Sequence, residues 1–230
     1  MWLTYYKDEG KAEFEKHEAL QIQYSINEGE AEDEDDSPEH HGTMVASKAL
    51  GKKYGVAKDA TLVSVKLRKP SKRITEDFVK GLQLILENLL TKQERQGKSV
   101  VISSLGFGVA KDPKTDDDEA KMRRLLQELF ALGVPFVTSS GNLGNLKPDM
   151  HRLPKILEAP DLPIINVGAV TNFREYAFYS QGGTHLTISA PGGLDTFKLT
   201  GQSKDSGVPR DDSGTSFGKS LLLLQYMAGG

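Results

Sequence analysis

Three short stretches, far apart in the chain, carry residue types that together could perform acyl transfer. His41 opens the stretch HGTMVAS, Asn142 closes the stretch SSGN, and Ser216 lies within SGTSFG. A serine hydroxyl is too weakly acidic to attack an amide unless a neighbouring base takes its proton, and an imidazole can be that base. An asparagine amide can donate a hydrogen bond to the oxyanion that the attack creates. The three stretches therefore indicate a nucleophilic hydrolase.

Each of these residues has a plainer explanation when it is taken alone. Ser216 would be a helix cap in a glycine-rich turn, Asn142 a turn former, and His41 a surface or core imidazole. His40 beside His41 invites a zinc site, but adjacent histidines are poor joint ligands on a helix, and no His, Asp or Glu spacing completes a zinc set. We therefore expect no metal site and no cofactor.

The elements that must position these residues alternate between strands and helices. Apolar β-prone runs predict strands over 2–6, 61–67, 99–105, 134–139, 163–170 and 185–190. Helical periodicity predicts helices after His41, over 76–96, from Thr115 to Gly133 and over 216–228, with a further surface segment at 11–20. This alternation is typical of an α/β, doubly wound, mostly parallel sheet with helices on both faces.

Capping residues set the expected ends of the two longest helices. Thr75 would cap the helix over 76–96, and Gly97 would end it. Thr115 with Asp118 fits a capping box for the next helix, which would stop at Gly133.

The motifs HGTMVAS, SLG, SSGN, APG and SGTSFG, in this order, resemble the subtilisin-like serine peptidases, or subtilases. The resemblance covers about residues 40–218 and implies a serine endopeptidase. It assigns the general base to His41, the nucleophile to Ser216 and the oxyanion-hole amide to Asn142, by analogy with subtilisin itself.

The same resemblance implies a peptide substrate held along a strand end. By this resemblance, the substrate backbone would pair with Ser104, Leu105 and Gly106. One wall of the primary specificity pocket would be formed by Ser139, Ser140 and Gly141. These small residues predict room for a large side chain, unless a Lys or Glu on another wall changes that preference.

The sequence departs from the family pattern in front of the histidine and behind the serine. The family places Asp-Thr-Gly or Asp-Ser-Gly after an apolar run, whereas the nearest match here, Asp8-Glu9-Gly10, follows Lys7. Asp8 is thus a candidate for the aspartate that orients His41, with an exposed turn as the alternative. Behind Ser216, Gly218 and Lys219 replace the usual Ala and small residue. A catalytically incomplete subtilase-like remnant, or a fragment truncated at both ends, is the alternative function.

Composition and charge limit the domain count and the classes of partner that this chain could have. A chain of 230 residues without a composition shift predicts a single domain over 1–230, and 29 basic against 32 acidic residues give no support for nucleic-acid binding. Eight acidic residues crowd into positions 28–39, which predicts a solvated loop, with a calcium site or a basic partner as the alternatives. No signal peptide or membrane span is recognisable, so we expect a monomer that acts on peptides and contacts no membrane, and the sequence assigns no compartment.

Overall fold

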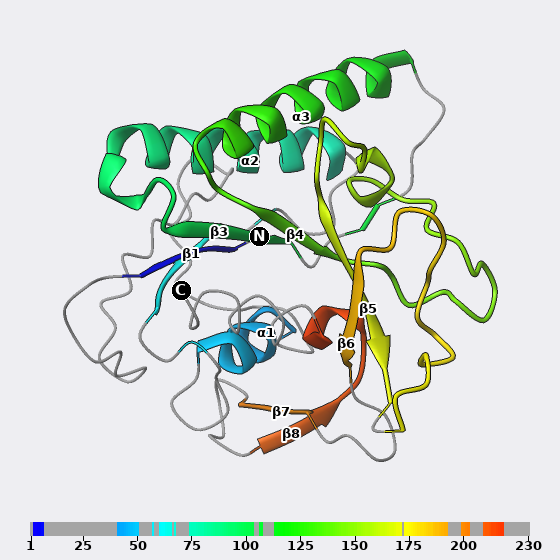
Figure 1. Ribbon diagram of the computed structural model, residues 1–230. Helices are drawn as coiled ribbons and strands as arrows, with labels where there is room; N and C mark the ends of the chain where they lie inside the picture. The colour runs from blue at the N-terminus through cyan, green and yellow to red at the C-terminus, as the bar shows by residue number, and fades with distance from the viewer. Residues whose placement is uncertain are drawn as a thin grey trace.

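The computed structural model describes residues 2–6, 41–50, 57, 60–65, 67, 74–103, 106–107, 113–171, 173–192, 199–202 and 209–218. These residues form three layers (Figure 1). The helices α2 (Ile74–Thr91) and α3 (Pro113–Ala131) cover one face of a sheet, and α1 (His41–Leu50) lies on the other side. The helix predicted after His41 is therefore confirmed, and His41 is its first residue.

The main sheet has six strands in the order β2-β1-β3-β4-β5-β6. Their bounds are β1 Trp2–Tyr6, β2 Ala60–Ser64, β3 Ser99–Ser103, β4 Phe136–Ser139, β5 Ile165–Val170 and β6 Ile188–Pro191. The strands from β3 to β6 run parallel, whereas β1 is antiparallel to both of its neighbours. The predicted doubly wound, mostly parallel α/β fold is confirmed.

Strand β3 shows how the sequence builds two apolar layers. Val101 packs with Phe136 in the cluster beneath α2 and α3, while Val100 and Ile102 belong to a second cluster with Val137. Successive side chains of a strand point to opposite faces, so a continuous apolar run is buried on both sides. The alternation places the chemistry at the strand ends, because the strand interiors are filled.

Helix α2 begins and ends earlier than predicted. Thr75 lies inside the helix rather than at its cap, and the α-helix stops at Thr91. The chain then folds back in a short 3-10 turn, because Arg95 donates to Asn88 Oδ1 at 2.6 Å and Gln96 donates to the Leu89 carbonyl at 3.0 Å. These tertiary hydrogen bonds satisfy the helix end, and the predicted extension to Gln96 is wrong.

Helix α3 also begins earlier than its predicted capping box. It starts at Pro113, so Thr115 lies within the first turn rather than before it. Proline suits the first helical position, because its fixed φ is helical and it has no N–H to satisfy there. The predicted end is close to the observed one: the helix stops at Ala131, and Gly133 adopts a φ of 69°.

A two-stranded hairpin was not predicted. It pairs β7 (Leu199–Gln202) with β8 (Pro209–Asp212) in antiparallel fashion. Neither strand shows apolar alternation, so the sequence pattern gave no signal for them. The hairpin matters because β8 leads directly into the turn that carries Ser216.

Several predictions concern residues outside the described part. They are the segment 11–20, the acidic loop 28–39, Asp8, Ser104 and Leu105. The helix predicted over 216–228 is described only as far as Gly218, where residues 215–218 are helical.

Candidate active site

His41 and the serine turn meet through an aromatic contact. The rings of His41 and Phe217 lie 5.6 Å apart between centroids in an edge-to-face arrangement. Phe217 also packs with Met44 and Val45 of α1, and all three side chains are buried. Helix α1 and the turn therefore share one small apolar cluster. Within it, the imidazole of His41 contacts Phe217, the residue that follows Ser216.

Asn142 is tied to the residue before Ser216 by two hydrogen bonds. Its Oδ1 accepts from the backbone N–H of Thr215 at 3.0 Å and from the Thr215 hydroxyl at 2.9 Å. A backbone N–H can only donate, so the atom that faces it must be the amide oxygen. The Nδ2 group of Asn142 is consequently the donor end of the amide, next to Gly214.

Two glycines allow the serine turn to pack closely against its neighbours. Gly214 has a φ of 150°, and a Cβ at this position would lie 3.1 Å from Asn142 Nδ2. Any side chain there would crowd the donor amide. A Cβ on Gly218 would lie 3.1 Å from the carbonyl oxygens of both Gly168 and Ala190. Close packing of the turn on β5 and β6 thus favours glycine at 218, where the family pattern has alanine.

The residues predicted to bind substrate lie at the carboxyl ends of two adjacent strands. Gly106 follows β3, and Gly141 follows β4, whose last residue is Ser139. Ser139 and Ser140 are buried, whereas Gly141 is half-buried. Gly141 donates its N–H to the Thr215 hydroxyl at 3.2 Å, so the β4 end is joined directly to the serine turn.

Lys155 also belongs to this region, and sequence reasoning missed it. Its side chain is 2% exposed, and a Cβ on Gly106 would lie 2.6 Å from its Nζ. Burial, with a smaller effect of the nearby Arg152 guanidinium, lowers the pKa of Lys155 to about 8. No motif surrounds Lys155 in the sequence, so only the folded chain reveals its position.

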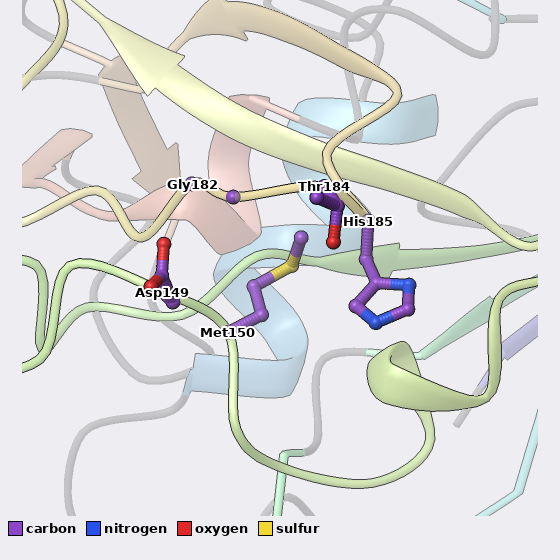
Figure 2. A pocket seen from close by; sticks show the side chains of 6 residues that line it. Asp149, Met150, Gly182, Thr184 and His185 are labelled. Carbon is purple, nitrogen blue, oxygen red and sulfur yellow. The ribbon is translucent and has the colours of Figure 1, made fainter.

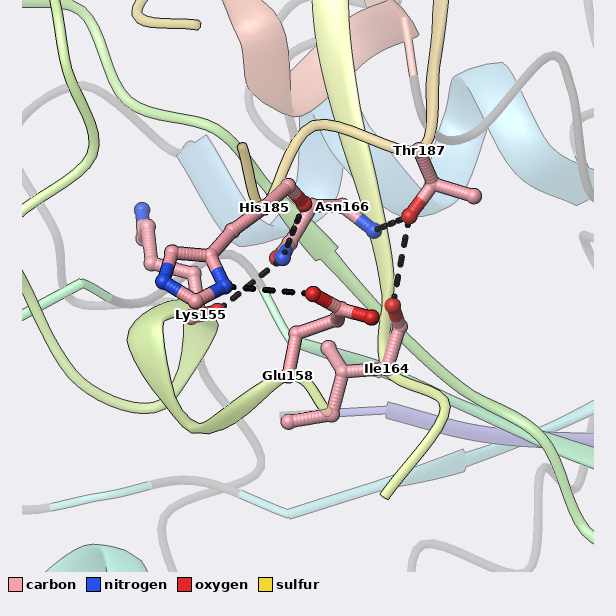
Figure 3. A network of polar contacts seen from close by, with 6 residues as sticks. All are labelled: Lys155, Glu158, Ile164, Asn166, His185 and Thr187. Atoms are coloured by element: carbon pink, nitrogen blue, oxygen red, sulfur yellow. Dashed lines mark hydrogen bonds and ion pairs between the residues drawn. The ribbon is translucent and has the colours of Figure 1, made fainter. Parts of the chain in front are cut away.

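The backbone of Lys155 is fixed by a buried asparagine. Asn166 Nδ2 on β5 donates to the Lys155 carbonyl at 3.0 Å and to the His185 carbonyl at 2.8 Å. Figure 3 shows the Lys155 side chain running away from this network, while Glu158 faces His185. The His185 ring and the Glu158 carboxylate are 3.1 Å apart. Glu158, the acidic residue nearest to Lys155 in the sequence, therefore pairs with His185 and not with Lys155.

A small pocket includes His185 in its lining but none of His41, Asn142 and Ser216. It encloses about 250 Å³ and is lined by Asp149, Met150, Gly182, Gly183, Thr184 and His185 (Figure 2). None of the predicted catalytic residues lines it, so we do not assign it to the catalytic centre.

Comparisons with known proteins identify the family of the chain. The sequence model of the subtilase family matches residues 7–219. The chain belongs to the subtilase family. This subtilase chain is 31% identical over 167 residues to subtilisin-like protease 8 of Arthroderma benhamiae, covering 70% of the chain and 31% of that protein. It is 30% identical over 193 residues to the subtilase-type proteinase psp3 of Schizosaccharomyces pombe, covering 84% of the chain and 38% of that protein.

Solved structures support the fold assignment of this subtilase. A cold-adapted subtilisin-like serine proteinase superimposes with a TM-score of 0.62 at 25% identity, covering 82% of this chain and 61% of that one. An epidermin leader peptide processing serine protease from Staphylococcus aureus gives a TM-score of 0.64 at 18% identity, covering 81% and 51%. The chain thus spans about a third of the two relatives above and one half to three fifths of these structures.

Among the described residues, no group of three His, Cys, Asp or Glu side chains could hold a metal ion. No helix among them has the length and apolar character needed to cross a membrane.

Proposed function

We propose that this subtilase chain is a serine endopeptidase in which Ser216 is the nucleophile, His41 the general base and Asn142 the oxyanion donor. The observation that carries the proposal is the pair of hydrogen bonds from Thr215 to Asn142 Oδ1. They fix the Asn142 amide through its Oδ1 and leave its Nδ2 as the donor, next to Gly214 of the serine turn. A donor fixed before the reaction begins stabilises the developing charge without reorganising.

The proposed reaction has two halves. His41 accepts the hydroxyl proton as Ser216 Oγ forms a bond to the substrate carbonyl carbon, and Asn142 Nδ2 donates to the resulting oxyanion. The protonated imidazole then gives the proton to the leaving amine as the C–N bond breaks. His41 then deprotonates a water molecule as this attacks the acyl carbon; the bond to Ser216 Oγ breaks, Oγ regains its proton from His41, and the second product leaves as a carboxylic acid.

An orienting carboxylate for His41 completes the proposal. Asp8 is the candidate that the sequence offers, and it lies outside the described residues. Replacing the orienting aspartate of a serine-protease triad by asparagine lowers kcat by about 10⁴-fold, a value known for chymotrypsin-like enzymes. A similar loss of kcat in Asp8→Asn, with an unchanged free energy of unfolding, would identify Asp8 as the group that orients His41. An unchanged rate would exclude it.

Covalent labelling tests the proposal directly. A small fluorophosphonate probe reacts with activated serines, and the labelled peptide can be identified by mass spectrometry. We expect labelling of the peptide that contains Ser216 and none in Ser216→Ala. A matched control is Ser213→Ala, which removes an exposed hydroxyl three residues earlier and should retain labelling.

The opposite outcome would favour the other candidate. If a folded sample is not labelled at Ser216, the chain lacks an activated nucleophile. It would then be a catalytically incomplete member of the family, in agreement with the absence of a recognisable aspartate motif before His41.

A further inference from the structure

A buried ammonium lies between the two strand ends that flank the proposed substrate site. Lys155 Nζ would be 2.6 Å from a Cβ on Gly106, after β3, and 3.6 Å from a Cβ on Gly141, after β4. Each strand end therefore has a glycine where it meets the ammonium. Any larger residue at Gly106 would displace it, because the contact would be closer than van der Waals distance.

The ammonium has no acidic partner in the described part of the chain. Glu158, on the same turn, faces His185 instead, and no carboxylate contributes to the altered pKa of Lys155. A second cation, Arg152, lies alongside, with its guanidinium 3.5 Å from the Gly106 carbonyl oxygen. An unpaired buried charge is costly, so the retention of the buried Lys155 ammonium at this place points to a ligand that supplies the opposite charge.

Gln181, the polar side chain next to Gly141, is held in place by hydrogen bonds to other residues. Gln181 donates from Nε2 to the carbonyl oxygens of Lys147 and Asp149, each at 2.8 Å. Its Oε1 is consequently turned toward Gly141, and Gln181 N–H donates to the Gly141 carbonyl at 3.0 Å. The wall beside the ammonium is thus rigid, as a specificity site requires.

The ammonium is also close to the proposed chemistry. Gly141, which it approaches, donates to the Thr215 hydroxyl, and Thr215 precedes Ser216. Asn142, the proposed oxyanion donor, follows Gly141. The side chain of the residue whose carbonyl is attacked must lie beside this carbonyl, and so within reach of the same strand ends.

We infer that Lys155 determines specificity, so that this chain cleaves preferentially after acidic residues, glutamate or aspartate, whose carboxylate pairs with the Lys155 ammonium. The inference rests on the proposed function. At neutral pH the ammonium remains charged, since the pKa of about 8 lies above 7. Arg152 reinforces the positive field at Gly106.

The test uses two fluorogenic peptides of otherwise identical sequence. The residue before the cleaved bond is glutamate in one peptide and glutamine in the other. These side chains have nearly the same shape and differ in charge. We expect kcat/KM at pH 7 to be about tenfold to a hundredfold higher for glutamate, the range for a hydrogen bond between charged groups in a partly buried site. Equal rates, or a preference for glutamine, would overturn the inference.

Lys155→Met then assigns the preference to one side chain. Methionine keeps much of the aliphatic stem and removes the charge, and we expect the glutamate to glutamine ratio to fall to about one. The matched control is Lys92→Met, at an exposed lysine beyond the end of α2, which should leave the ratio and both rates unchanged. A ratio that survives in a folded Lys155→Met protein would contradict the role of Lys155.

The fluorophosphonate probe separates the two levels of the argument, because it has no side chain for the specificity site. Labelling at Ser216 together with equal glutamate and glutamine rates would refute the acidic preference and leave the peptidase intact. Absence of labelling at Ser216 would refute both.

Discussion

The layer beneath α2 and α3 differs sharply from the carboxyl edge of the sheet, although both are buried. The helix layer is filled by apolar side chains such as Phe78, Leu82 and Phe136, none of which is exposed. The edge buries Lys155 and Gln181 to nearly the same degree. Apolar burial stabilises the fold, whereas buried polar groups stabilise it little or oppose it. Apolar packing therefore stabilises the helix layer, whereas the carboxyl edge buries polar side chains beside the proposed catalytic site.

Ser216→Ala should separate the two regions most clearly. In subtilisin itself, loss of the serine lowers kcat by about 10⁶-fold, and we expect a loss of this order here. The free energy of unfolding should change by less than about 1 kcal/mol, because only a hydroxyl is removed. Peptide hydrolysis and urea unfolding measure the two quantities on the same sample. A large loss of stability would show that the edge also supports the fold.

Phe78→Ala is the reverse experiment, at the centre of the helix layer. Phe78 contacts the rings of Phe107 and Phe136 at centroid distances of 5.2 and 6.3 Å. Truncation of a buried phenylalanine lowers the free energy of unfolding by about 3–5 kcal/mol. Denaturant titration should show this loss, while any protein that remains folded should keep its reactivity toward the fluorophosphonate probe.

Asn142→Ala should affect the rate and spare the fold. Removing one oxyanion donor costs about 10²–10³-fold in kcat, a value taken from subtilisin itself. The control is Asn145→Ala, an exposed asparagine in the same loop, which should leave kcat unchanged. Equal effects of the two substitutions would mean that the loop, rather than the Asn142 amide, is responsible.

Lys155→Met should make the protein more stable, which is the opposite of most core substitutions. The pKa of Lys155 is lowered from 10.5 to about 8, so the folded state binds its proton less tightly than the unfolded state does. The resulting cost to stability, at most about 3 kcal/mol, is fully present below pH 8 and disappears as the pH rises toward 10.5.

The stability gain of Lys155→Met should follow the same pH window. Among the described residues, Arg152 is the charged group that acts on Lys155, and the neighbouring Gly106, Gly141 and Gln181 carry no charge. Thermal or urea unfolding of the variant and wild type at pH 7 and pH 10 measures the difference. A gain that is the same at both pH values would show that the buried charge is not its cause.

Thr215→Val should give the smallest change, because it keeps the side-chain shape and the backbone hydrogen bond to Asn142 Oδ1. It removes the hydroxyl that donates to Asn142 Oδ1 and accepts from the Gly141 N–H. We expect about a tenfold lower kcat, corresponding to the loss of this hydroxyl, with KM unchanged. A change in KM alone would indicate a role in substrate binding. Recovery of kcat by Thr215→Ser would confirm that the hydroxyl is the group that matters.

The sequence by itself determined the alternation of elements and the identity of the family. Apolar runs marked the strands from β2 to β6, and five ordered motifs identified the subtilase family. Local patterns were sufficient because strand and helix periodicity arise within a few residues. The same patterns placed the helix after His41 and put Asn142 beyond a strand end.

Only the tertiary structure decided the remaining features. The end of α2 was misplaced because Arg95 and Gln96 reach back to it, and the hairpin before Ser216 has no apolar pattern to reveal it. Lys155 comes from a segment without a motif, yet it lies between Gly106 and Gly141 because its turn meets the ends of β3 and β4 there. Burial and the charge around a residue depend on such distant neighbours. A pattern read along the chain therefore predicts candidate reactive residues, and the folded chain shows which strand ends the buried Lys155 ammonium approaches.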